Sequence, residues 1–297
     1  MFMLYFSTAY GDIWWPGLVL LGLVIGVVTG LFGIGGGFLL TPSLRIIFNI
    51  PYPVAIGSSM LHIMLTATLS AYKHWAQKNV DPKLGILMAI GSLFGAESGV
   101  RLLRVINAWG TVDIIVSVCF LVLMTLVAAF MFYESTQDGI EEPKTVLGEM
   151  LKSCKLPPLI SFERSDIAHL SVWIPITLSF FVGCLTGLLG IGGGFINFPL
   201  MVYLIGVPTR VAVGTGTFQV LVASAYCVFR NLQDGFIDFL LVFLMILGSV
   251  VGVNMGVKLC VLINVRSTRK YFASILLLAI TMLVYYLLKN YLLNICR

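Results

Sequence analysis

Two stretches of the sequence decide the fold, and they closely match each other. Residues 30–42 read GLFGIGGGFLLTP, and residues 187–199 read GLLGIGGGFINFP. At this offset of 157 positions the sequence aligns with itself without a gap over about 80 residues, with further identities such as Pro51 with Pro208. We therefore interpret the chain as a fused duplication.

The composition excludes the common soluble classes. Of the 297 residues, 59% are hydrophobic and 10% are charged, and the mean hydropathy is +1.02. A soluble domain has about 45–50% apolar and about 25% charged residues. Transmembrane helices, each of about 20 apolar residues, fit this composition better. The net charge of +5 is interpreted as an orientation signal and not as a nucleic-acid patch. Six cysteines without a CxxC pair predict no metal site, and no cofactor is expected.

The predicted fold is an all-α polytopic membrane protein with two homologous halves. We expect a first membrane repeat over 1–133, a hydrophilic linker over 134–170, and a second membrane repeat over 171–297. Each repeat begins with a long hydrophobic segment, 16–50 or 172–205, that glycine and proline interrupt. About three transmembrane helices follow in each repeat.

The paired GxGGGF…P element resembles that of the TauE/SafE family of sulfite and sulfonate exporters. The resemblance covers residues 16–292, nearly the whole chain. It implies a secondary transporter for small sulfur-containing or organic oxyanions. Because the family is broad, the resemblance supports the general function of an anion carrier better than sulfite as the specific substrate.

Two membrane topologies are compatible with the glycine-broken segments. If each segment crosses the membrane, each half has four spans and the halves are parallel; if each segment is re-entrant, the halves are inverted. The re-entrant arrangement places about twice as many basic residues on one side as on the other, which the positive-inside rule favours. It predicts external termini and a cytoplasmic linker in the plasma or inner membrane.

The glycine clusters are the predicted binding site. After each break the chain can resume as a half-helix, over 38–48 and 195–205, whose N-terminus offers backbone N–H groups and about half a positive charge. Glycine lets a ligand approach the backbone closely. Close helix packing is the alternative reason for such glycines. The predicted contacts are Gly35, Gly36, Gly37, Phe38, Gly192, Gly193, Gly194 and Phe195.

Polar side chains follow each break at equivalent positions. Ser58 aligns with Thr215 and His62 with Gln219, and positions four apart share a helix face. They predict substrate-binding donors, although interhelical hydrogen bonds are an alternative. The predicted set is Ser58, Ser59, His62, Thr215, Thr217 and Gln219. Imidazole titrates near neutral pH, so His62 could also carry a proton, whereas Gln219 cannot.

Glu97 is the acidic residue well inside an apolar segment. Arg101 follows four residues later, an order that favours an intrahelical ion pair. Intramembrane acids also mark ion pathways, so Glu97 is a candidate for proton coupling. Asp81 and Asp238 stand at predicted helix starts, where capping is the expected role.

These features predict a secondary transporter, an exporter that works by alternating access and holds its anion at paired half-helix N-termini near the membrane midplane. An anion channel that uses the same helix ends is the alternative. The chain lacks a nucleophile–base pair and a zinc pattern, so an enzyme is not expected. The expected partners are a small anion, the lipid bilayer and a coupled proton, with no nucleic acid.

Overall fold

A computed structural model describes residues 5–8, 11–32, 36–136, 156–165, 167–262, 274 and 276–288. These residues are mostly helical. The helices are α1 (Trp15–Phe32), α2 (Gly37–Phe48), α3 (Tyr52–Ala76), α4 (Pro82–Ala108), α5 (Val112–Thr136), α7 (Trp173–Leu189), α8 (Gly194–Pro199), the π-helical turn η2 (Leu200–Ile205), α9 (Thr209–Gln233), α10 (Phe239–Leu262) and Leu276–Leu288. The all-α prediction missed two short antiparallel hairpins, β1 (Tyr5–Thr8) with β2 (Gly11–Trp14) and β3 (Leu159–Phe162) with β4 (Ile167–Ser171).

Five helices in the described ranges are long and apolar enough to cross a membrane. They are α3, α4, α9, α10 and the first part of α5, Val112–Ala129. The helices on either side of each break are shorter, as is Leu276–Leu288. The chain is therefore a multi-pass membrane protein.

The first glycine break folds α1 and α2 into an antiparallel hairpin. A Cβ atom on Gly17, near the start of α1, would lie 3.3 Å from the Phe48 ring at the end of α2. At the other end of the hairpin, a Cβ on Gly36 would lie 2.6 Å from both Ile25 and Thr29 of α1. The chain therefore turns at the break, and α2 returns toward the end at which α1 began.

The two half-helices form at the predicted positions to within a residue, but they differ in regularity. Helix α2 is α-helical from Gly37 to Phe48, whereas the second half-helix changes at Pro199 from α8 to the π-helical η2. Proline has no N–H group to donate within a helix. Since Pro42 lies inside α2 at the equivalent place, the proline alone does not account for the π-helical turn.

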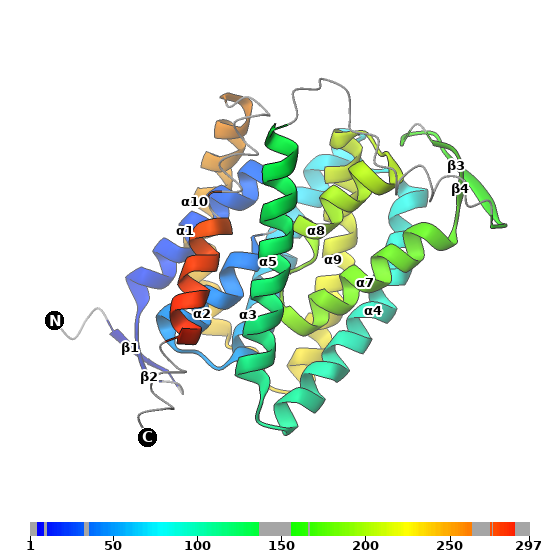
Figure 1. Cartoon of the computed structure of the whole chain (residues 1–297). Helices are drawn as coiled ribbons and strands as arrows, with labels where there is room; N and C mark the ends of the chain where they lie inside the picture. Colours follow the sequence, from blue (N-terminus) through cyan, green and yellow to red (C-terminus); the bar gives the residue numbers. More distant parts are fainter. Residues whose placement is uncertain are drawn as a thin grey trace.

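Two long helix pairs pack through glycine. Helix α1 lies against α10, and α4 lies against α7 (Figure 1). A Cβ on Gly252 of α10 would lie 2.2 Å from Leu23 O of α1, and a Cβ on Gly95 of α4 would lie 2.0 Å from Phe180 O of α7. Both pairs bring backbones into contact, which only small residues allow in a membrane. In Figure 1 the pairs flank the two half-helices, with α3 and α9 also between them.

Contacts at one end of the bundle join the end of α2 to two other helices. Arg45 of α2 pairs with Asp113 at the start of α5 at 2.9 Å and donates to Tyr286 Oη, also at 2.9 Å. Figure 1 shows this end at the lower left, with β2 and the red helix Leu276–Leu288, while α5 ends at the top of the view.

The predicted hydrophilic linker contains a folded part. Its β3–β4 hairpin packs beside the start of α4, where Ser165 Oγ donates to Asp81 Oδ2 at 2.8 Å and Arg164 donates to Val80 O at 2.7 Å. Phe162 of β3 is fully buried. Residues 137–155 of the predicted linker lie outside the described residues.

Candidate functional site

The two glycine breaks meet inside the molecule. The rings of Phe38 and Phe195 lie 5.1 Å apart, centroid to centroid, and both side chains are buried. A Cβ on Gly37 would lie 2.8 Å from Ile191 O. Thr41 Oγ1 of α2 donates to Gly190 O, at the end of α7, at 3.1 Å. The starts of α2 and α8 are thus brought together, as the glycine pattern predicted.

Neither half-helix has a side-chain cap at its N-terminus. Gly36 and Gly193 precede the helices with φ of 63° and 71°, a left-handed conformation that favours glycine. The helical hydrogen bonds begin at their carbonyls, with Leu40 N–H donating to Gly36 O and Asn197 N–H donating to Gly193 O. Each end therefore directs the positive pole of a helix into the interior, which is the electrostatic basis of an anion site.

The glycines also have a packing role. A Cβ on Gly193 would lie 2.6 Å from Val182 Cγ1 and 2.7 Å from Thr186 Oγ1, and Gly36 contacts α1 in the same way. The space that a Cβ would occupy at these two glycines is therefore filled by side chains of α1 and α7, as the close-packing alternative predicts. Gly192 and Gly194 are buried at the second break, and Gly35 lies outside the described residues.

In the first half, the polar residue next to the break reaches another helix pair. His62 Nε2 lies 2.6 Å from Ser249 Oγ of α10, and Ser249 Oγ donates to Gly22 O of α1 at 2.8 Å. His62 is fully buried, and its Nδ1 atom has no hydrogen-bond partner within the described residues. Ser59 Oγ, also fully buried, has none there either.

The second half has an amide pair at the matching depth. Asn197 Nδ2 donates to Gln219 Oε1, and both side chains are buried. The Asn197 Oδ1 atom has no partner among the residues that the structure describes. Thr217 Oγ1 donates to Val213 O within its own helix at 2.7 Å. Polar atoms that lack a protein partner are costly to bury and need an explanation such as a bound ligand.

Ser58 and Thr215 hold the two halves together. Ser58 Oγ accepts from Asp238 N–H at 3.1 Å, and Thr215 Oγ1 accepts from Asp81 N–H at 3.0 Å. Both aspartates cap helix starts, since Asp81 Oδ1 accepts from Leu84 N–H and Asp238 Oδ1 accepts from Leu240 and Leu241 N–H. The predicted capping role is confirmed, and the two hydroxyls have a structural contact.

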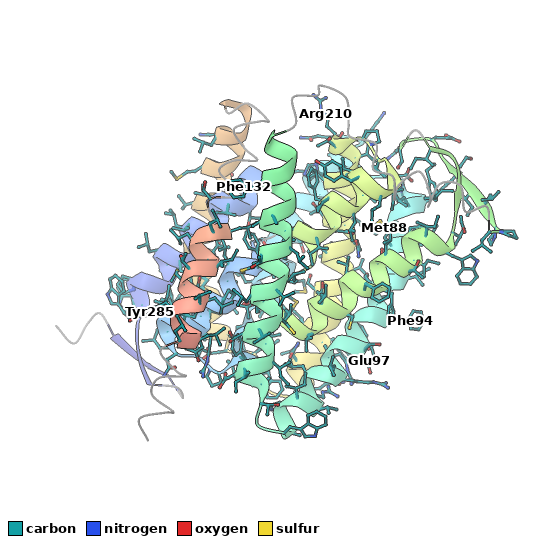
Figure 2. All side chains as sticks on the ribbon, in the orientation of Figure 1. Met88, Phe94, Glu97, Phe132, Arg210 and Tyr285 are labelled. Atoms are coloured by element: carbon teal, nitrogen blue, oxygen red, sulfur yellow. The ribbon has the colours of Figure 1, made fainter. Side chains whose placement is uncertain are left out.

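Glu97 lies in a cluster of charged and polar groups that joins α4 to α9. Its predicted pair with Arg101 is confirmed at 2.5 Å. The carboxylate also pairs with Arg230 at 3.1 Å and accepts from Tyr226 Oη at 2.7 Å. Figure 2 shows Glu97 toward the lower end of α4, beyond Phe94. None of its hydrogen bonds or ion pairs described here involves a residue of either break.

Sequence reasoning missed several residues of this region. Asn197 lies in the second motif, but its equivalent position is Leu40, so no paired polar signal pointed to it. Ser249 and Arg230 act across helices, which a sequence pattern along one segment does not reveal. The one available signal for Asn197 was the difference between the two motifs, which read FLLTP at residues 38–42 and FINFP at residues 195–199.

A separate apolar groove lies outside the break. It has a volume of about 500 Å³ and runs between α1, α2 and the helix Leu276–Leu288, with Ile25, Leu39 and Leu278 among its lining residues. Its lining is almost entirely hydrophobic, which suits contact with lipid better than anion binding.

The comparison with family models decides the class of protein. The model described as "Sulfite exporter TauE/SafE" matches residues 18–283. The chain belongs to the TauE/SafE family. This is a family of membrane transporters and not of enzymes.

Curated relatives of this TauE/SafE chain carry matching names. It is 29% identical to "Probable membrane transporter protein YunE" of Bacillus subtilis over 247 residues, covering 80% of this chain and 86% of the relative. It is 28% identical to YjnA of the same organism, covering 88% and 96%. It is 26% identical to MJ0441 of Methanocaldococcus jannaschii, covering 88% and 92%. No solved structure gives a significant match.

Proposed function

We propose that this membrane transporter is a secondary carrier that exports small oxyanions, such as sulfite or sulfonates, by alternating access. The observation that carries the proposal is the meeting of two uncapped half-helix N-termini, marked by the Phe38–Phe195 contact. An anion at this depth must exchange its hydration for fixed donors, and two helix ends supply positive potential without a buried lysine or arginine.

The unpartnered polar atoms beside the breaks support the same assignment. Ser59 Oγ and His62 Nδ1 belong to α3, and Asn197 Oδ1 belongs to α8. Ser59 and His62 are three positions apart and therefore share a helix face. Their neighbour Ile63 contacts both breaks, since a Cβ on Gly37 would lie 2.3 Å from Ile63 and a Cβ on Gly192 would lie 3.0 Å from it. A bound anion together with water can satisfy such groups.

We further propose that the halves 1–133 and 171–297 are inverted copies, joined by a cytoplasmic linker over 134–170, in the plasma or inner membrane. The α1–α2 hairpin supports re-entrant breaks, because α2 returns to the end at which α1 begins. Each of the two main helix pairs, α1 with α10 and α4 with α7, joins a helix of the first half to a helix of the second. This mutual packing supports two related halves. Inverted halves that meet at a midplane site are a common basis for alternating access.

Ser59→Ala tests the anion site without disturbing an existing hydrogen bond. Purified protein is melted in detergent with sulfite, thiosulfate, methanesulfonate and acetate, because a ligand that binds the native state raises the melting temperature. We expect stabilisation by the sulfur oxyanions, and an apparent Kd about five- to tenfold weaker in Ser59→Ala, equivalent to about 1–1.4 kcal/mol.

Ser43→Ala is the matched control for this experiment. Ser43 lies on α2 but lines the apolar groove, so its removal leaves affinity unchanged. Equal anion affinity in wild type and Ser59→Ala, or an anion bound in the groove instead of at the breaks, would overturn the site. Counterflow in proteoliposomes then separates a carrier from a channel, since a channel gives linear flux without counterflow.

Cysteine labelling at equivalent positions tests the inverted arrangement. Ala76 ends α3 and Gln233 ends α9, both are exposed, and they are 157 positions apart. In a background without native cysteines, an impermeant maleimide applied to intact cells should label Gln233→Cys and not Ala76→Cys. Labelling of both positions from the same side contradicts inverted halves.

A further inference from the structure

The hydrogen-bond chain at His62 fixes which ring nitrogen carries the proton. Ser249 has a single hydroxyl proton, which it donates to Gly22 O at 2.8 Å, and a carbonyl oxygen only accepts. Ser249 Oγ must therefore accept from His62 Nε2, 2.6 Å away. In the neutral ring the proton thus resides on Nε2, and Nδ1 presents a bare lone pair.

This lone pair is buried and has no partner within the described residues. His62 is fully buried, and Nδ1 has no partner in the described part of the chain. The next residue, Ile63, contacts Gly37 and Gly192 of the two breaks. On the other side of the ring, the Ser249 backbone packs against Gly26 of α1, whose preceding residue Ile25 contacts Gly36. His62 is therefore linked to the α1–α10 contact through Ser249, and its chain neighbour Ile63 contacts the glycine breaks.

We propose that Nδ1 of His62 is the proton-binding site of the transport cycle, and that one proton binds there with each anion. This inference rests on the proposed anion site. A sulfonate has only acceptor oxygens, so it repels a bare Nδ1 lone pair and binds an Nδ1–H. One proton from solvent adds to Nδ1, the imidazolium charge offsets that of the anion, and the proton leaves Nδ1 when the anion departs.

The described charged side chains on the surrounding helices do not pair with the His62 ring. Helix α1 has no ionisable side chain, and Lys258 of α10 is nine residues beyond Ser249, roughly 13 Å along the helix. The elements packed against α3 carry these ionisable groups: Arg45 on α2, Asp113, Cys119, Tyr133 and Glu134 on α5, Arg210, Tyr226, Cys227 and Arg230 on α9, and Lys258 and Cys260 on α10. No hydrogen bond or ion pair links His62 to those of these groups whose side chains the structure describes; the side chains of Tyr133, Glu134 and Cys260 lie outside that description.

Glu97 is the competing candidate, and its contacts disfavour it. Its carboxylate is held by Arg101, Arg230 and Tyr226, all of which stabilise the charged form. A proton that binds there must compete with two guanidinium groups. Among the described residues, His62 Nδ1 has no such competitor.

Counting protons during anion binding tests the inference. The full-length protein in detergent is titrated with methanesulfonate and thiosulfate, which remain ionised from pH 6 to 9, in two buffers of different ionisation enthalpy. We expect uptake of about one proton per anion at pH 7.5, and a Kd that rises about tenfold per pH unit above it, because proton uptake and affinity are linked.

His62→Gln places an amide where the second half has Gln219, so it keeps a donor but cannot titrate. In this variant we expect anion binding with no proton uptake and a Kd independent of pH, whereas Glu97→Gln keeps the wild-type uptake. Binding without uptake in wild type, or unchanged uptake in His62→Gln, overturns the proton site and leaves the anion site standing. If neither anion binds to wild type, both proposals fail.

Discussion

The two breaks share a backbone scaffold and differ in the polar groups beside it. At equivalent positions the first half has Leu40, Ser59 and His62, and the second half has Asn197, Gly216 and Gln219. His62 reaches out to Ser249 of α10, whereas Gln219 bonds to Asn197 of α8 within its own half. One break therefore has an ionisable ring linked to a helix pair, and the other has a neutral amide pair.

The difference shows which positions are constrained by packing and which by chemistry. The glycines of the breaks and helix pairs repeat because their neighbours leave no room for a Cβ atom. The polar positions lie on α8 and on α3 and α9, which contact the breaks through Ile63 and Val220, and they can diverge without disturbing the backbones. In the proposed mechanism this divergence gives the site one proton-binding group and one neutral binding group.

The largest expected effect tests the shared scaffold. In Gly95→Ala and Gly252→Ala the new methyl group would lie 2.0 Å from Phe180 O and 2.2 Å from Leu23 O, both backbone atoms. Because the backbones must separate, we expect each variant to lose about 3 kcal/mol of stability or fail to fold. Thermal melting and the monodisperse yield in detergent measure the loss.

Gly216→Ala is the matched control for the glycine variants. The nearest atoms to its new methyl group are 3.5 Å away, an ordinary contact distance. Alanine is also the better helix former, so stability should stay equal or rise by up to about 1 kcal/mol. If only one of Gly95→Ala and Gly252→Ala unfolds the protein, the two helix pairs are not equivalent. The conclusion that both halves share one backbone scaffold would then be contradicted.

Much of this scaffold could be predicted from the sequence, because its signals are local. Glycine clusters followed by proline predicted the breaks and both half-helices, and Asp81 and Asp238 were correctly predicted as caps. The partner of His62 could not be predicted, since Ser249 is 187 residues away and comes close to it only where α10 packs against α3. The short hairpins were also missed, because four- or five-residue strands have little periodic signal.

The Ser59 side chain shows where aligning the sequence with itself helped and where it misled. Equivalent polar pairs such as Ser58 with Thr215 drew attention to α3 and α9, yet this pair proved to bond to Asp238 and Asp81 between the halves. Of the three unpartnered groups near the breaks, Ser59 and Asn197 have no polar residue at the equivalent position, whereas His62 aligns with Gln219. The aligned positions in the sequence therefore identified the scaffold and His62, but they did not point to Asn197.

The smaller expected effect concerns two equivalent serines and sharpens the comparison directly. Ser249 of α10 accepts from His62 and donates to Gly22 O, whereas Ser92 of α4 donates only to Ala89 O, one turn earlier in its own helix, among the described contacts. Ser249→Ala leaves the buried Nε2–H of His62 without an acceptor, which should cost about 1–2 kcal/mol. Ser92→Ala removes a bond to a carbonyl that keeps its helical partner, so it should cost less than about 0.5 kcal/mol.

A double-mutant cycle assigns the cost of Ser249→Ala to its contact with His62. We expect Ser249→Ala and His62→Leu to be non-additive by about 1 kcal/mol, because each change removes the same hydrogen bond. Ser92→Ala combined with His62→Leu should be additive, since the structure gives those two side chains no mutual hydrogen bond. Equal losses from the two serine variants, measured by thermal melting, would show that the His62–Ser249–Gly22 chain contributes little. The Nε2 tautomer would then lack its structural support, and the proton site would lose its basis even if the anion site remained.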